Sequence, residues 1–191
     1  MSTTPLFPVH TLDSAPNAAK PSLQAAAAAF GFVPNIIGVM AASPALAEAY
    51  LTLSGIFERK TDLSPAERQV VLLTVSRYHE CTYCVAAHTI VASMQDVPAQ
   101  VVEAIRSDSP IQDVRLEALR QLVSAMMAKR GWLTEDDVAR FLAAGYTPGQ
   151  LFDVLVGVAQ KVLSNFTNHL ADTPLDEPFS ASAWSPVTGS E

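Results

Sequence analysis

The sequence predicts an all-α protein, a single-domain helical bundle of about eight or nine helices. Hydrophobic residues make up 49% and charged residues 16% of the 191 residues, which is enough apolar material for one buried core. Alanine is abundant and aromatic residues are few, a composition that favours helix over sheet. No segment shows a convincing alternation of apolar and polar residues, which is the usual mark of a half-buried strand.

One kind of helix start recurs along the chain. "SPAE" at 64–67 is a complete capping box with proline at the first helical position. "TPGQ" at 147–150 has the same form, and "SP" at 43–44 has the cap and the proline. The run "VVLLTV" at 70–75 could pass for a buried strand, but it follows the first of these caps and continues into "SRYHE". A buried helix is therefore predicted.

These starts and the apolar periodicity predict nine helices and divide the chain into three parts. The helix ranges are 22–30, 35–41, 44–60, 65–79, 82–95, 98–106, 112–130, 135–144 and 148–170. Residues 1–20 and 172–191 are rich in proline and show no period. We therefore expect an N-terminal arm (1–20), a helical domain (21–171) and an extended C-terminal tail (172–191).

The charge pattern argues against a nucleic-acid partner. The formal net charge is −7, the pI is about 5.0 and the 12 basic residues are scattered, whereas a phosphate-binding surface needs clustered lysine and arginine. The N-terminal segment lacks the basic and apolar regions of a secretory signal, and the most apolar stretches are too short or too interrupted to span a membrane. We expect a cytoplasmic protein with no membrane partner.

The stretch "ECTYCVAAH" at 80–88 contains both cysteines of the chain, Cys81 and Cys84, and ends in His88. In a reducing compartment, two cysteines at this spacing are more often catalytic or metal-binding than structural. A structural zinc site needs four ligands, and this stretch supplies three. A disulfide across two residues closes a loop too small to add much stability.

A redox couple fits the motif better than zinc or a structural disulfide. If a helix starts near Cys81, both thiols lie in its first turn, where the free N–H groups and the positive end of the helix dipole favour thiolate. His88 would lie on the same face as Cys84, one turn further on, and can exchange a proton near neutral pH. A pair of buried structural cysteines beside a core histidine remains an alternative.

The motif and the residues before it carry a family resemblance. "CTYCVAAH", preceded by "LSPAERQVVLLTVSRYHE", resembles the core of the alkylhydroperoxidase D/carboxymuconolactone decarboxylase superfamily. "FGFVPNIIGVMAASPALAEAY" and "QKVLSNFTNHLADTPLD" resemble flanking segments of its peroxidase-related branch, so the resemblance covers roughly residues 25–178. It implies an all-α fold of the alkylhydroperoxidase D-like type, usually a homo-oligomer (a dimer, trimer or hexamer), whose thiol members reduce peroxides.

The resemblance also implies roles for the motif. Cys84 would be the thiol that attacks the peroxide, and Cys81 the thiol that resolves the product. His88 would belong to the proton relay that activates Cys84. Turnover needs an electron donor, and the sequence has no fingerprint of a flavin, haem or nicotinamide. We therefore expect no cofactor and no metal, and an external dithiol reductant.

Two positions depart from the family's relay, and two carboxylates stand near it. Tyr83 occupies a position where the family often has histidine, and Gln69 one where the best-studied relay begins with glutamate. An amide can orient a partner but cannot accept a proton as a carboxylate does. Glu67 is better interpreted as the return carboxylate of its capping box. Glu80, four residues before Cys84, is either a replacement base or an ordinary acidic residue near a helix N-terminus.

The sequence therefore favours a thiol-dependent (alkyl) hydroperoxidase, a disulfide oxidoreductase of the peroxiredoxin type that acts on a small hydroperoxide. Two alternatives remain open. One is an acid–base enzyme of the carboxymuconolactone decarboxylase type, in which the dithiol is incidental. The other is a non-catalytic helical module whose dithiol holds zinc or senses the redox state.

Overall fold

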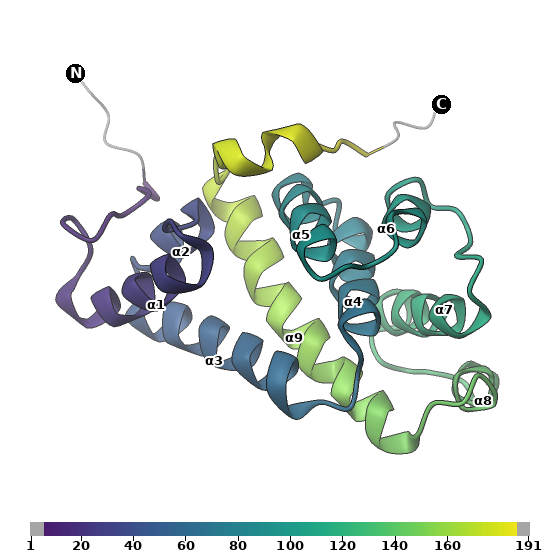
Figure 1. Ribbon diagram of the computed structural model, residues 1–191. Coiled ribbons are helices and arrows are strands. Elements are labelled where there is room, and N and C mark those ends of the chain that lie inside the picture. Colours follow the sequence, from purple (N-terminus) through teal and green to yellow (C-terminus); the bar gives the residue numbers. More distant parts are fainter. Residues whose placement is uncertain (1–5, 187–191) are drawn as a thin grey trace.

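Residues 6–186, which the computed structural model describes, form nine α-helices and two short 3-10 helices (Figure 1). The α-helices are α1 (Lys20–Phe30), α2 (Asn35–Met40), α3 (Pro44–Lys60), α4 (Pro65–Tyr78), α5 (Thr82–Met94), α6 (Ala99–Arg106), α7 (Val114–Ala128), α8 (Glu135–Ala143) and α9 (Pro148–Ala171), and the 3-10 helices are η1 (Asn17–Ala19) and η2 (Glu177–Ser182). The prediction of an all-α fold is confirmed, and every predicted helix boundary lies within two residues of the observed one.

The predicted helix starts are present as hydrogen bonds. The Ser64 hydroxyl accepts from the backbone N–H of Glu67, whose carboxylate accepts from the backbone N–H of Ser64. Thr147 and Gln150 form the same box at the start of α9, and the Ser43 hydroxyl caps α3. Each such cap contributes about 1 kcal/mol to stability, which explains why the local sequence defined these boundaries so closely.

α4 and α9 lie at the centre of the bundle. α4 packs against α5, α6, α7 and α9, while α3 runs along the other side of α9 and α1 and α2 close that side (Figure 1). The run at 70–75 is buried all around its circumference, and Val70, Val71 and Val75 have no exposed surface. A helix covered on every side needs apolar residues on every side. For that reason this helix has the sequence pattern of a buried strand.

Two apolar clusters fill the interior. The first lies among α3, α4, α6, α7, α8 and α9, and includes Phe57 and Phe141. The second lies among α1, α2, α3 and the first turn of α5, and includes Cys81, Cys84 and Phe179. The joint between α4 and α5 lies where the two clusters meet, so the cysteine motif is enclosed by helices from both ends of the chain.

α9 carries an unusual buried polar face. Five of its buried polar residues recur at one-turn intervals in its C-terminal half, namely Gln160, Lys161, Ser164, Asn165 and Asn168. Polar side chains are buried at a cost unless they find partners, so this face points to a polar site inside the bundle. Among the residues that the structure describes, no helix is both long enough and apolar enough to cross a membrane.

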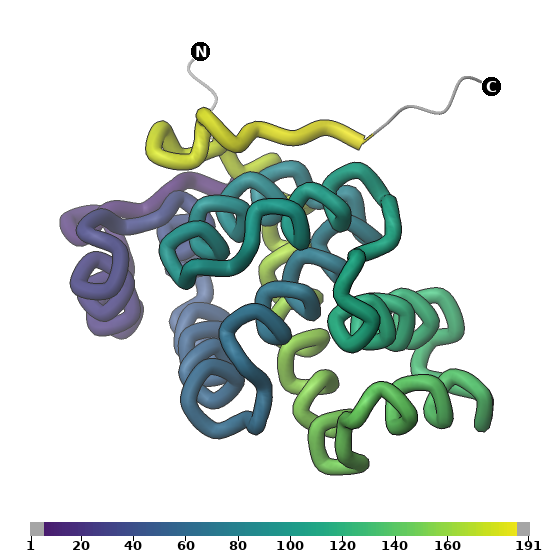
Figure 2. The backbone as a smooth tube through the Cα atoms, turned by 45° about the vertical axis from the view of Figure 1, so that its right-hand side comes forward, coloured from purple at the N-terminus to yellow at the C-terminus, as the bar shows by residue number. Residues whose placement is uncertain are grey.

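The C-terminal segment is folded onto the bundle rather than extended. It forms η2, which crosses over the end of the bundle where α5 begins (Figures 1 and 2). The carboxylate of Asp176 accepts from the backbone N–H of Asn35, Phe179 is buried, and the indole N–H of Trp184 donates to the carbonyl of Arg106. These anchors overturn the prediction of an extended tail over 172–186. Residues 1–5 of the predicted arm and 187–191 of the tail lie outside the described residues.

Candidate active site

The turn between α4 and α5 fixes the position of the first cysteine. α4 ends at Tyr78 with His79 as its C-cap, and Glu80 follows in the left-handed conformation with φ 54°. The N–H of Glu80 donates to the carbonyl of Arg77, and the N–H of Cys81 donates to that of Ser76, both at 2.9 Å. This is the Schellman arrangement, which satisfies the last carbonyls of a helix. α5 begins at once, with Cys81 as its N-cap.

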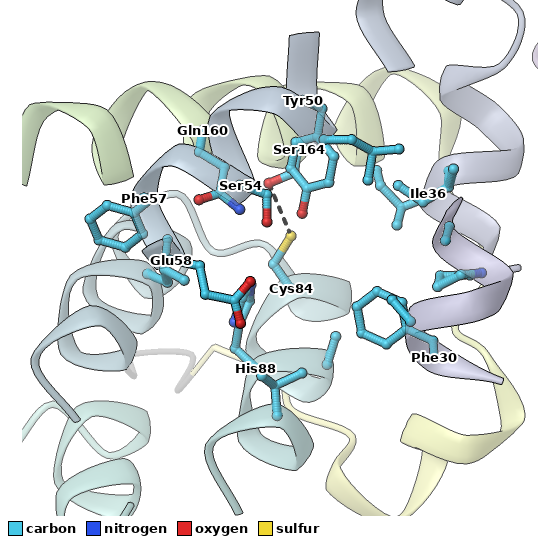
Figure 3. Close-up of a pocket in the computed structure, with 18 of the residues that line it drawn as sticks. Phe30, Ile36, Tyr50, Ser54, Phe57, Glu58, Cys84, His88, Gln160 and Ser164 are labelled. Carbon is cyan, nitrogen blue, oxygen red and sulfur yellow. Dashed lines mark hydrogen bonds between the residues drawn. The ribbon is translucent and has the colours of Figure 1, made fainter. Parts of the chain in front are cut away.

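The two thiols are free and differ in what they face. Both are buried, with 1% of Cys81 and 3% of Cys84 exposed. Cys84 lies in the first turn of α5 and lines a cavity, whereas Cys81 is not part of the cavity wall. The Asn168 amide Nδ2 lies 3.2 Å from the Cys84 sulfur and 3.7 Å from that of Cys81, and Ser164 Oγ lies 3.8 Å from the Cys84 sulfur (Figure 3).

A buried lysine supplies positive charge next to Cys84. Lys161 projects from α9, has 1% of its surface exposed and lines the same cavity. Burial alone would lower the pKa of Lys161, but the negative charge of Cys84 outweighs burial and raises it. A buried ammonium is strongly unfavourable unless an anion accompanies it. The Cys84 thiolate is that anion.

The pKa values of the two thiols are shifted in opposite directions. Burial alone would raise the pKa of Cys84, but the hydrogen bond from Cys81 and the charge of Lys161 outweigh it and hold the pKa well below its ordinary value. Donating that hydrogen bond, together with burial, raises the pKa of Cys81. Cys84 is therefore the thiolate and Cys81 the neutral thiol.

His88 holds Lys161 in place and does not touch the thiol. Its Nε2 lies 3.0 Å from Lys161 Nζ and its Nδ1 lies 3.0 Å from the Gln69 amide oxygen. An ammonium can only donate, so Nε2 accepts from Lys161 and the Nδ1–H donates to Gln69. The Gln69 amide N–H in turn donates to Gln95 at 3.0 Å. Burial and the charge of Lys161 lower the pKa of His88 well below its ordinary value, so the imidazole is neutral.

Tyr83 supports the site from behind. Its hydroxyl donates to the Asp176 carboxylate at 2.5 Å, and the backbone N–H of Ile36 lies 3.4 Å from the same oxygen. Burial and the contact with Asp176 raise the pKa of the Tyr83 phenol. The ring also lines the cavity and packs edge-on against Phe179. Tyr83 is therefore a wall residue tied to the C-terminal segment.

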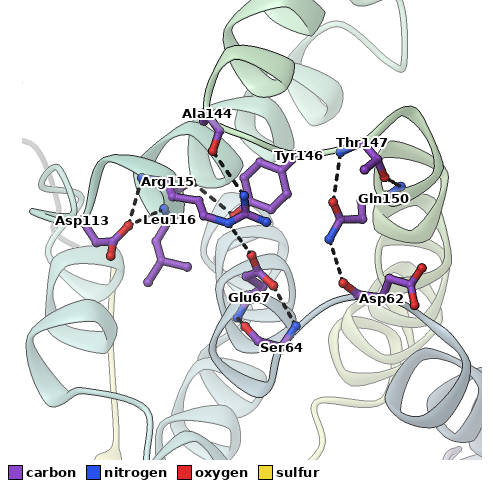
Figure 4. Close-up of polar contacts among 10 residues, drawn as sticks. All are labelled: Asp62, Ser64, Glu67, Asp113, Arg115, Leu116, Ala144, Tyr146, Thr147 and Gln150. Atoms are coloured by element: carbon purple, nitrogen blue, oxygen red, sulfur yellow. Dashed lines mark hydrogen bonds and ion pairs between the residues drawn. The ribbon is translucent and has the colours of Figure 1, made fainter.

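Glu67 lies apart from the thiols, as its capping-box interpretation predicted. Its carboxylate accepts from the Ser64 backbone N–H at 2.7 Å and pairs with the Arg115 guanidinium at 3.0 Å (Figure 4). Burial alone would raise the pKa of this carboxyl, but the hydrogen bonds from Ser64 and Arg115 hold it below its ordinary value. Glu67 does not line the cavity that contains Cys84.

Glu80 does not stand beside Cys84. The sequence spacing suggested one helical turn between them, but α5 begins at Thr82 and Glu80 belongs to the end of α4. The side chain is exposed and is not part of the cavity wall. The geometry expected for a replacement base is therefore wrong, because a left-handed residue separates the two helices.

The cavity in front of Cys84 has a volume of about 550 Å³. Ligand sites for small organic molecules fall in this range. Several other charged and polar side chains line it besides Cys84, His88 and Lys161, namely Tyr50, Ser54, Glu58, Arg59, Arg68, Gln69, Tyr83, Gln95, Gln160 and Ser164. Most of the remaining wall is apolar and includes Phe30, Ile36, Ile37, Phe57, Leu72 and Phe179 (Figure 3). Cys84 thus faces a space whose wall is mainly apolar and also carries charged side chains.

Part of the chain matches a known protein family. Residues 44–125, from the start of α3 into α7, match the model of the carboxymuconolactone decarboxylase family, and this segment includes both cysteines. Over this segment the chain is similar to that family, and its fold is of the alkylhydroperoxidase D-like type. No curated protein sequence matches it significantly.

Solved structures share the alkylhydroperoxidase D-like fold along almost the whole chain. A peroxidase-related protein from Ralstonia eutropha JMP134, described as an alkylhydroperoxidase D core, is 20% identical with a TM-score of 0.81, and the match covers 93% of this chain and 96% of that one. A peroxidase-related protein from Silicibacter sp. TM1040 is 16% identical (TM-score 0.76; 94% and 97% covered). The debrominase Bmp8, as a cysteine-to-alanine variant with 2,3,4-tribromopyrrole, is 17% identical (TM-score 0.77; 95% and 96% covered).

Sequence reasoning missed the part of the site that comes from α9 and the C-terminal segment. These residues are Gln160, Lys161, Ser164, Asn168 and Asp176. One signal could have found the first four: in "QKVLSNFTNH" the polar residues recur at helical spacing inside an otherwise apolar helix. That pattern indicates a polar face on this helix. Because the helix lies at the centre of the bundle, the polar face is buried.

The zinc alternative finds no ready ligand cluster in the described residues. Over 6–186, no three or more His, Cys, Asp or Glu side chains are placed to hold one metal ion. Of the ligands considered from the sequence, His88 directs its two nitrogens to Gln69 and Lys161, and the sulfurs of Cys81 and Cys84 lie near Asn168.

Replacing Glu80 by glycine separates a structural role from a chemical one. A side chain in the left-handed conformation costs about 1 kcal/mol relative to glycine, so Glu80→Gly should raise the free energy of unfolding by about that amount. The pH dependence of Cys84 alkylation should stay as in the wild type. Denaturant unfolding and alkylation followed by mass spectrometry measure the two quantities.

The matched control for that change is Glu48→Gly, at an exposed position inside α3. There glycine should lower the free energy of unfolding by about 1 kcal/mol, since it destabilises a helix interior. A shifted alkylation profile in Glu80→Gly, with Glu48→Gly unchanged, would restore Glu80 as a base acting on the thiol.

Proposed function

We propose that the protein is a thiol-dependent hydroperoxidase, a disulfide oxidoreductase of the peroxiredoxin type. One observation carries the proposal: Cys84, paired with the buried Lys161, lines the cavity, while Cys81 lies behind it as a neutral thiol. In this arrangement Cys84 attacks the substrate and Cys81 resolves the product. The peroxidase-related proteins that share the fold support the same chemistry.

The first step transfers one oxygen to sulfur. The Cys84 thiolate attacks the distal oxygen of the hydroperoxide, the O–O bond breaks, and the leaving alkoxide takes a proton from the Lys161 ammonium. The products are an alcohol and a sulfenic acid on Cys84, with Lys161 neutral. Stabilising the charge that develops on the leaving oxygen is the role expected of a preorganised cation in a dry site.

The second step forms the disulfide and regenerates the site. The neutral amine of Lys161 takes the proton of Cys81, whose sulfur attacks the Cys84 sulfur. Hydroxide leaves as water by taking that proton back. An external dithiol then reduces the disulfide, and the proton of Cys84 returns to Lys161. His88 orients Lys161 throughout, and Gln69 orients His88.

A homo-oligomer is proposed with this activity. α9 exposes a stripe of large apolar side chains on the face that does not point into the bundle, namely Phe152, Leu155, Phe166 and Leu170. Contiguous exposed apolar surface of this kind supports contact with another subunit.

The proposed activity is tested by titrating the reduced protein with cumene hydroperoxide. One equivalent should remove both free thiols, reduce the mass by two hydrogens and yield one equivalent of alcohol, and dithiothreitol should restore the thiols. A dithiol that stays intact in excess peroxide would refute the proposal. Turnover of a lactone acid that survives loss of both thiols would favour the decarboxylase-type alternative.

The cavity favours a second candidate function, reductive dehalogenation. Its volume is far larger than hydrogen peroxide requires, and much of its wall is apolar. The debrominase Bmp8 shares the fold. The balanced reaction replaces an aryl–bromine bond by an aryl–hydrogen bond while both thiols become a disulfide and HBr is released. Supplying 2,3,4-tribromopyrrole to the reduced protein tests it: one bromide should appear for each pair of thiols lost.

A further inference from the structure

The cavity wall carries charged side chains where it opens toward solvent. The wall is buried at Cys84 and Lys161, half-buried at Arg68, and exposed at Glu58 and Arg59. The side chain of Glu58 points into the cavity from α3 (Figure 3). The thiol therefore lies in the buried part of the cavity, and the more accessible part carries two positive charges and one negative charge.

The backbone of α3 leaves room for the first guanidinium against the wall. Arg59 follows Gly55 by one helical turn, and both residues line the cavity. Side chains on a helix lean toward its N-terminus, and a Cβ at position 55 would lie 2.5 Å from Arg59 Nη2. The guanidinium thus lies against the glycine, and a larger side chain at that position would displace it.

A backbone carbonyl holds the second guanidinium. Arg68 lies in the first turns of α4, and its Nη1 donates to the carbonyl of Leu63, which precedes the helix. Within residues 6–186, neither Arg59 nor Arg68 forms an ion pair with a carboxylate. Both therefore keep donors for a ligand, and the planar guanidinium matches a carboxylate through two parallel hydrogen bonds.

We propose that Arg59 and Arg68 bind the carboxylate of an acidic hydroperoxide, a molecule with a carboxylate at one end, an apolar body and the peroxide at the other end. The body contacts the apolar wall, which includes Phe57 and Leu72, and the peroxide reaches Cys84. The protein has a net charge of −7, so the two arginines offset the repulsion that an anionic substrate otherwise meets. The reactive group rests on the proposed function, whereas the preference for a carboxylate does not.

Two unreactive probes test this preference. 2-Phenylpropan-2-ol is neutral, and its para-carboxylate differs only in the charged group. Titration calorimetry on the reduced protein gives the dissociation constant of each, and the ratio of the two constants removes effects that both probes share. The wild type should bind the carboxylate more tightly. Arg68→Gln should shift the ratio about tenfold against the carboxylate, and the more exposed Arg59→Gln about threefold.

Three further variants leave both arginines in place. Gly55→Ala should displace the Arg59 guanidinium and shift the ratio in the same direction as Arg59→Gln, and alanine suits a helix interior, so this variant should fold. Glu58→Gln removes the opposing charge and should shift the ratio toward the carboxylate. Lys60→Gln is the matched control, because Lys60 is exposed, follows Arg59 and does not line the cavity. Its ratio should match the wild type.

The outcomes separate this proposal from the proposed function. An unchanged ratio in both Arg59→Gln and Arg68→Gln, no binding of either probe, or a wild type without preference for the carboxylate would overturn the arginine site. Carboxylate-dependent binding, without turnover of cumene hydroperoxide or of its para-carboxylate, would leave the arginine site intact and refute the peroxidase. Turnover of both peroxides with equal kcat/KM, whether or not the arginines are present, would do the reverse.

Discussion

Replacing Lys161 by methionine should slow the alkylation of Cys84 at pH 7 about 100-fold. Methionine fills a similar volume but removes the charge that opposes burial at this thiol. With burial left as the main influence, the pKa of Cys84 should rise above the ordinary value for cysteine. At neutral pH the thiol would then be almost wholly protonated, and peroxide reduction should fall in proportion.

The pH dependence of alkylation shows in which direction the substitution shifts the pKa of Cys84. In the wild type, Cys84 should stay reactive at neutral pH and lose reactivity only as the pH falls through its lowered pKa. In Lys161→Met, reactivity should appear only in the alkaline range. Alkylation by iodoacetamide at a series of pH values, resolved for each cysteine by mass spectrometry, measures both profiles.

Lys60→Met is the control for the loss of a lysine, since Lys60 is exposed at the end of α3 and does not line the cavity. Its profile should match the wild type. If Lys161→Met also matched the wild type, Lys161 would not be the source of the low Cys84 pKa, and the ion pair at the centre of the proposed mechanism would be wrong.

The two cysteine-to-serine variants should fail in different ways. Cys84→Ser should lose peroxide reduction by a factor of at least about 1000, because no thiolate is left at the cavity. Cys81→Ser should react once and stop, since the sulfenic acid on Cys84 has no resolving thiol. Dimedone should therefore label Cys84 in that variant after one equivalent of peroxide, and mass spectrometry of the intact protein and its peptides detects the adduct.

Cys81→Ser also tests the hydrogen bond between the thiols. A serine hydroxyl at position 81 can still donate to the Cys84 sulfur, so Cys84 should keep most of its acidity and its first reaction should proceed at a rate close to that of the wild type. If Cys84→Ser instead gave the dimedone adduct, on Cys81, the assignment of attacking and resolving thiols would be reversed.

Local signals predicted the helices of this protein, because its helices begin with side chains that cap their own backbone. The capping boxes at Ser64 and Thr147 define these boundaries through hydrogen bonds between residues three apart in the chain. The spacing of Cys81, Cys84 and His88 likewise placed these three within the N-cap and first two turns of one helix. These features depend on residues close in the chain, and there the sequence was sufficient.

What the sequence missed depends on residues far apart in the chain. The neutral Gln69 was expected only to orient a partner, and it does bond to His88. Nothing near the motif, however, indicated that the charge would come from Lys161. The suggestion that Glu80 lies one turn before Cys84 has the same origin. A spacing of four residues brings side chains together only inside one helix, and Glu80 itself, with its positive φ, interrupts the helix here.

The thiols and the residues that contact them lie far apart in the sequence, so the site can form only late in synthesis. Asn168 contacts Cys84, which lies 84 residues earlier in the chain. Asp176 contacts Tyr83, which lies 93 residues earlier. On a ribosome, α5 emerges long before α9 and η2 do. Until α9 has emerged and docked, Cys84 lacks Lys161, whose charge helps to hold its pKa low. The nascent chain is thereby spared a reactive thiolate while its core is still open.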